Sequence, residues 1–183
     1  MPQDKRYFWL DFGSWFLGGR FMRVLLQKFD LDIRRRFGEA IGRHSFGVDS
    51  LIVRDRVNYK LGPHTDASSK LLSLLFYCPD DDSTKHLGTS IYEPMDPGFR
   101  CRGGPHYPHD RFIRVATMDY RPNSLFAFFK TDNSFHGVEP ITDGGVLRDL
   151  LLYDIRVIQR EEPSSGSPRA GWSMLKRIFG KKS

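Results

Sequence analysis

The amino-acid sequence predicts a mainly β domain with helices at its N-terminus. Two observations support this class. Apart from a short stretch at the C-terminus, helical hydrophobic spacing falls in the first 45 residues, and short β-branched or aromatic runs separated by turn residues follow it. Many short strands at this spacing are typical of a sandwich or barrel rather than a parallel sheet covered by helices. We expect strands at 50–59, 70–77, 89–93, 113–118, 124–130 and 149–158.

The N-terminal segment combines aromatic and helical patterns. Residues 1–18 are rich in aromatic side chains without a clear period, so we expect a short helix or strand packed against the core. Residues 19–29 and 31–41 have helical spacing, and Gly42 is a candidate C-cap for the second segment. The three consecutive arginines at 34–36 fit a solvated helix face, with a phosphate contact as the alternative.

With 183 residues, the chain has the length of one domain with a substantial core. We assign residues 1–159 to that domain, with helical support at 1–45 and a strand core at 46–159. Residues 160–171 have the composition of a linker, and 172–183 form a basic amphipathic tail. The tail suits an anionic membrane surface or an acidic partner, and a frayed tail kept soluble by its lysines is the alternative.

The net charge of +6 is concentrated at the two ends of the chain. Residues 51–159 contain 13 Lys and Arg against 14 Asp and Glu, residues 1–50 contain 9 against 6, and residues 160–183 contain 6 against 2. An enzyme that acts on nucleic acid would be expected to carry its positive charge beside the reacting site. The charge distribution therefore argues against a nucleic-acid partner.

Cysteine content and hydropathy indicate the compartment. Cys78 and Cys101 are too few for a disulfide framework. No run approaches the roughly 18 apolar residues that a membrane span needs, and the charged first dozen residues do not resemble a signal peptide. We expect a cytoplasmic protein.

The segment 59–66 contains the pattern on which the functional prediction depends. Residues i and i+2 of an extended chain face the same side, so His64 and Asp66 could bind one metal ion together. His136 is the best candidate for a third ligand. Two histidines and one carboxylate form the facial triad of non-haem Fe(II) oxygenases, which leaves coordination positions open for other ligands. A His-x-Asp pair is expected by chance about 0.5 times in such a chain, so the surrounding pattern matters.

Arg148 is part of that surrounding pattern. It precedes the apolar run at 150–157, where burial of an unpaired guanidinium would cost several kcal/mol. The carboxylate of a bound dicarboxylic acid would be a suitable partner.

The order of these motifs resembles the 2-oxoglutarate and Fe(II)-dependent oxygenases, in particular their prolyl-hydroxylase-like branch. The resemblance rests on Tyr-x4-His-x-Asp, a leucine-rich strand that ends in Tyr, His-x-Val-x-Pro and the later Arg, and it extends over about residues 50–157. It implies a double-stranded β-helix (jelly-roll) fold. It also implies Fe(II) bound by His64, Asp66 and His136, with O2 as cosubstrate and ascorbate as an optional reductant.

The same resemblance implies a site for 2-oxoglutarate. Arg148 would bind its distal carboxylate, with Tyr59 and Tyr77 as helpers, although each tyrosine could equally be a core residue. The family often has a hydroxyl residue two positions after the arginine, where this chain has Leu150. It also often has a Gly-Gly pair before the next strand, where this chain reads His-Leu-Gly-Thr-Ser at 86–90.

The segment 94–112 is a long loop with four prolines, and loops of this length are often functional. If it covers the mouth of the barrel, His106 and Tyr107 would touch the substrate; a plain surface loop is the alternative. Cys101, His106 and His109 suggest a zinc site, but a fourth ligand with standard spacing is missing.

The sequence thus predicts an Fe(II)- and 2-oxoglutarate-dependent dioxygenase that hydroxylates a small-molecule or peptidyl substrate, with succinate and CO2 as coproducts. One alternative is a non-catalytic jelly-roll binding or scaffold protein that acts through its basic termini. Another is a cupin-like dioxygenase or isomerase without 2-oxoglutarate, which would leave Arg148 without a role.

Overall fold

A computed structural model describes residues 1–142 and 144–159, and its architecture is mainly β with helices at the N-terminus. The predicted linker at 160–171 and basic tail at 172–183 lie outside the described residues. No helix of the described part has the length and hydrophobicity needed to cross a membrane. The helices are α1 (Gln3–Phe16), α2 (Gly19–Lys28) and α3 (Asp30–Phe37), followed by the 3-10 helix η1 (Gly38–Arg43).

The strands of the described residues form two four-stranded antiparallel sheets that face each other as a sandwich. The chain crosses from one sheet to the other at every connection except the one between β4 and β5. The first sheet contains, in order, β1 (His44–Asp55), β8 (Arg148–Gln159), β3 (Lys70–Tyr77) and β6 (Ser124–Phe129). The second contains β2 (Leu61–His64), β7 (His136–Val138), β4 (Ser90–Pro94) and β5 (Phe112–Thr117).

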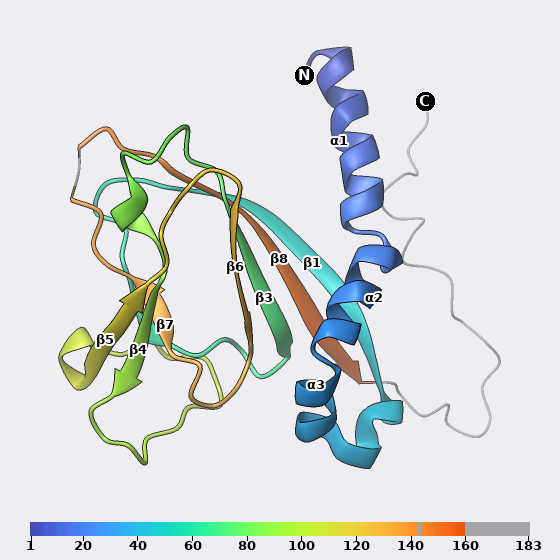
Figure 1. Ribbon diagram of the computed structural model, residues 1–183, viewed down its shortest axis with the longest axis vertical. Coiled ribbons are helices and arrows are strands. Elements are labelled where there is room, and N and C mark those ends of the chain that lie inside the picture. Colours follow the sequence, from blue (N-terminus) through green and yellow to red (C-terminus); the bar gives the residue numbers. More distant parts are fainter. Residues whose placement is uncertain (143, 160–183) are drawn as a thin grey trace, which may run out of the picture.

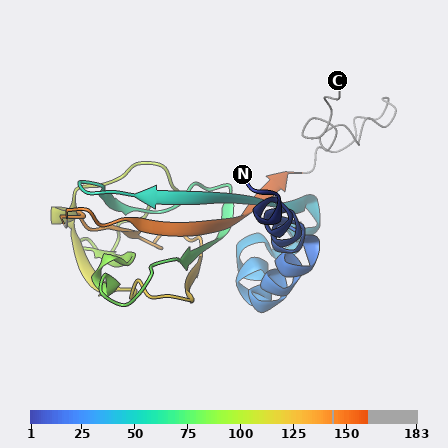
Figure 2. The same ribbon diagram turned by 90° about the horizontal axis from the view of Figure 1, so that it is seen from above.

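The helices pack on the outer face of the first sheet. Phe16, Leu25 and Ile33 are buried against strand residues that include Leu74 and Tyr153. Figure 1 shows α1, α2 and α3 in a column beside the first sheet. Figure 2 shows that the long strands β1 and β8 run from the sandwich to these helices. The second sheet covers the inner face, so much of β8 is enclosed on both sides, and its buried residues include the paired Arg148 and Asp154 as well as apolar side chains.

The region before His64 differs from the predicted single strand at 50–59. β1 starts earlier, at His44, and ends at Asp55, and the separate strand β2 covers Leu61–His64. Asn58 lies between them with a φ of 71°, a left-handed conformation that Asn adopts more readily than most residues. The three residues of β7 are too few to give a periodic signal, so this strand was not predicted either.

α3 ends earlier than predicted, because Gly38 and not Gly42 follows its last residue. Gly38 has a φ of 53° and a ψ of −133°, which an L-amino acid rarely adopts, so the α-helix cannot continue through it. Gly42 instead lies within η1.

Two fully buried tyrosines differ in their hydrogen bonding. The Tyr120 hydroxyl donates to the carbonyl oxygen of Asp149 at 2.9 Å and accepts from its N–H at 2.7 Å. Tyr120 therefore fixes the start of β8, next to Arg148. The hydroxyl of Tyr153 has no hydrogen-bond partner in the described part of the chain, and its ring packs edge-on against Phe16.

We predict that Tyr120→Phe lowers the free energy of unfolding by about 1–3 kcal/mol, because it leaves the Asp149 backbone groups without their partner. Tyr153→Phe is the matched control and should not lower this free energy, since no hydrogen bond is lost and a buried unpaired hydroxyl is removed. Urea unfolding of both variants measures the difference. Equal losses in the two variants would contradict the assignment.

Candidate metal centre

Three side chains meet between the two sheets. One ligand atom from each of His64, Asp66 and His136 lies within 4.8 Å of the other two, and all three residues are buried. His64 ends β2 and lies directly opposite His136, the first residue of β7, in the antiparallel pairing. Asp66 follows two residues beyond β2, in the connection to β3. The structure therefore brings together the three residues that the sequence singled out, although Asp66 is not in a strand.

Two glycines allow the backbone to approach closely around this group. A Cβ atom on Gly137 would lie 2.4 Å from the carbonyl oxygen of Leu61, so glycine is needed next to His136. Gly103 has a φ of 123°, and a Cβ atom there would lie 2.2 Å from the carbonyl oxygen of Asp66. The β4–β5 loop thus packs directly on the backbone that carries Asp66.

Backbone carbonyl groups fix the orientation of both imidazole rings. The Nδ1 atom of His64 lies 3.0 Å from the carbonyl oxygen of Gly62, and that of His136 lies 3.0 Å from the carbonyl oxygen of Ser134. A carbonyl oxygen only accepts hydrogen bonds, so Nδ1 carries the proton in both neutral rings. The Nε2 lone pairs are therefore available for a metal ion.

Two side chains of β3 orient the Asp66 carboxylate. The Ser73 hydroxyl donates to its Oδ2 at 2.6 Å, and the Lys70 ammonium lies 3.1 Å from its Oδ1. Lys70 also pairs with Asp154 of β8 at 2.8 Å. This network holds the carboxylate in place from the side of the first sheet.

The environment favours the protonation states that metal ligands need. Burial lowers the pKa of His64 to about 4. Burial also lowers the pKa of His136, although Asp66 opposes this change. Burial alone would raise the pKa of Asp66, but His136, Lys70 and Ser73 together lower it. Two neutral imidazoles and one carboxylate at neutral pH are a donor set that fits Fe(II).

The three residues open into a cavity of about 210 Å³ between the sheets. Much of its wall is apolar, which limits the access of water. The apolar lining residues are Val53, Leu61, Leu74, Leu75, Phe128, Val138, Leu150 and Leu152. The charged lining residues besides Asp66 are Asp55, Lys70, Arg148 and Asp154.

Arg148 lines this cavity and is bonded within the chain. Its Nη1 donates to Oδ2 of Asp55 at 2.6 Å, its Nε to the carbonyl oxygen of Leu87 at 2.6 Å, and its Nη2 to the Thr89 hydroxyl at 3.2 Å. Asp55 ends β1 directly opposite Arg148, and both side chains are about 95% buried or more. Burial of Arg148 therefore does not by itself require a dicarboxylic ligand, because the Asp55 carboxylate already compensates the charge of the guanidinium.

The two predicted tyrosine helpers lie in different positions. Tyr59 lines the cavity. Tyr77 does not line it. Its hydroxyl accepts the N–H of Thr89 at 3.2 Å, and its ring centroid lies 5.9 Å from the Arg148 guanidinium carbon. Tyr77 could therefore influence a ligand only through Arg148.

The β4–β5 loop places the two predicted substrate residues differently. The ring of His106 lies beside that of His64, with centroids 4.6 Å apart. The hydroxyl of Tyr107 donates to the Cys101 sulfur at 3.4 Å within an aromatic cluster. Neither residue lines the cavity as the described residues form it. The same residues do not include a metal-binding group of Cys101, His106 and His109.

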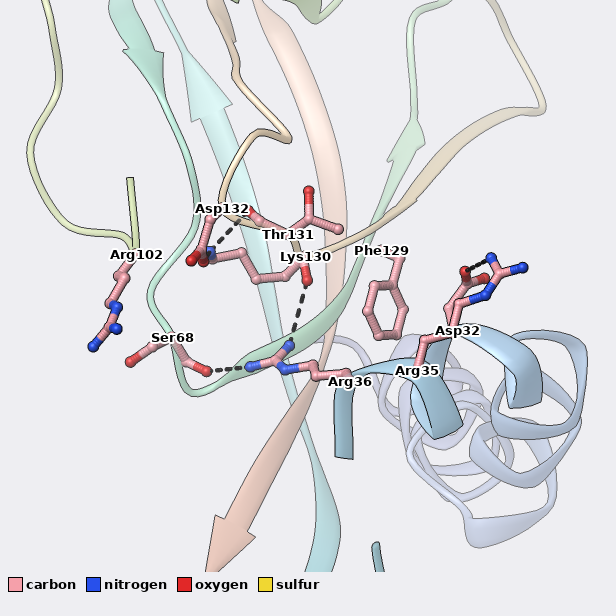
Figure 3. Close-up of a pocket in the computed structure, with 9 residues that line it drawn as sticks. All are labelled: Asp32, Arg35, Arg36, Ser68, Arg102, Phe129, Lys130, Thr131 and Asp132. Atoms are coloured by element: carbon pink, nitrogen blue, oxygen red, sulfur yellow. Dashed lines mark hydrogen bonds and ion pairs between the residues drawn. The ribbon is translucent and has the colours of Figure 1, made fainter. Parts of the chain in front are cut away.

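A larger cleft of about 630 Å³ lies apart from the three ligand residues, between α3 and the chain around Ser68 and Lys130 (Figure 3). Arg36 donates from Nη2 to the carbonyl oxygen of Ser68 at 2.6 Å and from Nη1 to that of Lys70 at 2.8 Å. Lys130 is buried and pairs with Asp132 at 3.2 Å. Arg36 therefore fastens α3 to the segment that follows Asp66, whereas Arg34 and Arg35 lie on the exposed helix face that the arginine run suggested.

The sequence prediction missed four polar residues of the site, namely Asp55, Lys70, Ser73 and Asp154. Each lies within a strand or at its end, so a polar residue in an apolar run was the available signal. An irregularity in the register between Lys70 and Leu72 adds one residue to β3 relative to β8. Such a bulge brings Lys70 to the same face as Ser73, which strict alternation would not predict.

No family model matches the chain, and no curated protein matches it. Among solved structures, it is similar to a Pseudomonas putida prolyl-4-hydroxylase, with 14% identity, 74% of this chain and 63% of that chain covered, and a TM-score of 0.42. The chain thus spans less than two thirds of that hydroxylase.

Two further structures are similar at the same level. EvdO2 from Micromonospora carbonacea var. aurantiaca has 11% identity, with 81% of this chain and 69% of that chain covered and a TM-score of 0.38. A chain of the disulfide-linked pili of Bacillus endospore appendages has 11% identity, with 64% and 93% covered and a TM-score of 0.36. All these TM-scores are below 0.5, so the functional argument rests on the geometry of the site.

Proposed function

We propose that this protein is an Fe(II)- and 2-oxoglutarate-dependent dioxygenase that hydroxylates a small-molecule or peptidyl substrate and releases succinate and CO2. The observation that carries the proposal is the convergence of His64, Asp66 and His136 beside a partly open cavity between the sheets. Two imidazoles and one carboxylate leave coordination positions open, as the reaction requires.

The strand order supports the corresponding fold. We interpret the sheets β1-β8-β3-β6 and β2-β7-β4-β5 as a double-stranded β-helix, because nearly every connection crosses between them. In this arrangement the connection after β2 supplies Asp66, and β7 supplies His136. The pairing of β2 with β7 places His64 directly opposite His136, so both ligand segments lie together beside the cavity.

Each part of the site has a role in this proposal. His64 and His136 offer their Nε2 atoms and Asp66 offers a carboxylate oxygen, while Lys70 and Ser73 hold that carboxylate in position. Bound Fe(II), with a 2-oxo acid and O2, would supply the oxidation of a C–H bond coupled to decarboxylation of the 2-oxo acid.

Arg148 and Tyr59 would orient the cosubstrate. Within the described residues, three of the five N–H groups of Arg148 have partners, which leaves two for a ligand. The apolar walls, which include Phe128 and Leu74, would exclude water from the reacting atoms.

A non-catalytic binding or scaffold function is the alternative of a different class. It would rely on the basic termini and would require no bound metal. A cupin-like reaction without 2-oxoglutarate is the third candidate, and the pairing of Arg148 with Asp55 removes the earlier objection that this arginine would lack a role.

We predict that His64→Ala weakens binding of Mn(II), an oxygen-stable substitute for Fe(II), by more than about 100-fold. Loss of a residue that only hydrogen-bonds to a metal ligand typically weakens metal binding by about 10–100-fold, and loss of the ligand itself should weaken it more. His106→Ala is the matched control, since its ring contacts His64 but does not belong to the triad. Calorimetric titration measures both affinities. Equal binding by His64→Ala and the wild type would contradict the metal site.

Turnover provides the direct test of the reaction. With Fe(II) and a screen of candidate substrates, the purified protein should release succinate from 2-oxoglutarate, and omission of either iron or 2-oxoglutarate should abolish the release. Mass spectrometry of succinate and of the substrate, which gains one oxygen atom, follows the reaction. Unchanged turnover in His64→Ala would exclude the proposed role of the triad.

Deletion of residues 161–183 separates the two classes of function. The oxygenase proposal predicts turnover within about twofold of the full chain, because the site is built from residues before 160. The scaffold alternative predicts no succinate release from either chain and loss of its binding function on deletion. Release by the full chain that persists after the deletion supports the oxygenase, and absence of release from both chains supports the scaffold.

A further inference from the structure

The charge balance of the cavity is unusual for the dianionic cosubstrate considered above. The charged groups that line it are the carboxylates of Asp55, Asp66 and Asp154 and the cations Lys70 and Arg148. With neutral histidines these groups have a net charge of −1, and a divalent metal ion would change it to +1. A 2-oxo acid with one carboxylate would then give zero, whereas 2-oxoglutarate, with two, would give −1.

The negative charge of Asp55 is the reason that the cavity balances one ligand carboxylate but not two. It occupies Nη1 of Arg148 at 2.6 Å, so an incoming carboxylate would meet an ion pair rather than a free cation. A third charge enclosed beside that pair lacks a counter-charge, and uncompensated charge in an apolar cavity is strongly disfavoured. Lys70 cannot supply the missing charge, because it already lies between Asp66 and Asp154.

Accepting the proposed function as a premise, we propose that Asp55 selects the cosubstrate by charge. A 2-oxo acid with an uncharged far end binds directly beside the Asp55–Arg148 pair, and 2-oxoglutarate binds only together with one proton, which Asp55 takes up. Asp55 of β1 therefore determines which ligand groups can bind next to Arg148.

The surroundings of Asp55 agree with this assignment. Its carboxylate faces Arg148 and Asp149 of β8 and Tyr59 of the segment after β1, and Asp66, Lys70 and Asp154 lie in the same cavity. Burial raises the pKa of Asp55, although Arg148 opposes the change, whereas the pKa of Asp66 is lowered. Asp55 is thus better suited than Asp66 to accept the proton. Because the bound form carries the extra proton, affinity for 2-oxoglutarate should fall as the pH rises.

Calorimetry with Mn(II) and without O2 tests the proposal by binding alone. The ligands are 2-oxoglutarate and its 5-methyl ester, which keeps the chain and the far carbonyl group but lacks the second charge. Titrations in two buffers of different ionisation enthalpy give the number of protons taken up. For the wild type at pH 7.5 we expect about one proton with 2-oxoglutarate and none with the ester.

Asp55→Asn should tighten 2-oxoglutarate binding by about tenfold or more, abolish the proton uptake and change ester binding by less than about threefold. Asp49→Asn is the matched control, because Asp49 also pairs with an arginine of β8, Arg156, but lies on the exposed surface. It should change neither affinity.

Three results would contradict the proposal, and the measurements distinguish them. If Asp55 only orients Arg148, Asp55→Asn will weaken both ligands together and the wild type will take up no proton, which overturns the proposal. Proton uptake that persists in Asp55→Asn also overturns it. If Mn(II) binds but neither ligand does in any variant, the 2-oxo acid function fails, and this inference fails with it. The wild-type proton count decides the question even if Asp55→Asn does not fold.

Discussion

The structure depends on the mutual pairing of charged side chains that are enclosed between two sheets. Helices cover the outer face of the first sheet and the second sheet covers its inner face, so the charged residues on the inner face are buried or largely buried. Asp66, Lys70 and Asp154 form one paired group, and Asp55 and Arg148 form the other. Loss of one member would leave its partner buried and unpaired, which typically costs more than the intact pair contributes.

The same pairing prepares the centre for chemistry. Ser73 and Lys70 hold the Asp66 carboxylate, and backbone carbonyls hold the two imidazole rings, so the three donors are oriented without a metal ion. Such preorganisation reduces the reorganisation that binding would otherwise require. In the proposed function Arg148 would be shared between Asp55 and the cosubstrate, so Asp55 would influence how the cosubstrate binds.

The sequence predicted the helices and strands whose hydrophobic spacing is clear within a short stretch of the chain. Helical spacing gave the region of α2, and the spacing of apolar runs gave most strands of both sheets. The grouping of His64, Asp66 and His136 was predicted from residue types. The partner of Arg148 was not, because Asp55 and Arg148 are 93 positions apart and meet only through the register of β1 with β8. Lys70 was missed because a bulge, which has no sequence signal here, turns it toward the cavity.

Anomalous diffraction from crystals of the wild-type protein containing Mn(II) would test the central claim most directly. The account predicts one strong peak per chain, within about 2.0–2.3 Å of Nε2 of His64, Nε2 of His136 and a carboxylate oxygen of Asp66. A peak bound by other residues, or none between the two sheets while Mn(II) is found elsewhere on the chain, would contradict it.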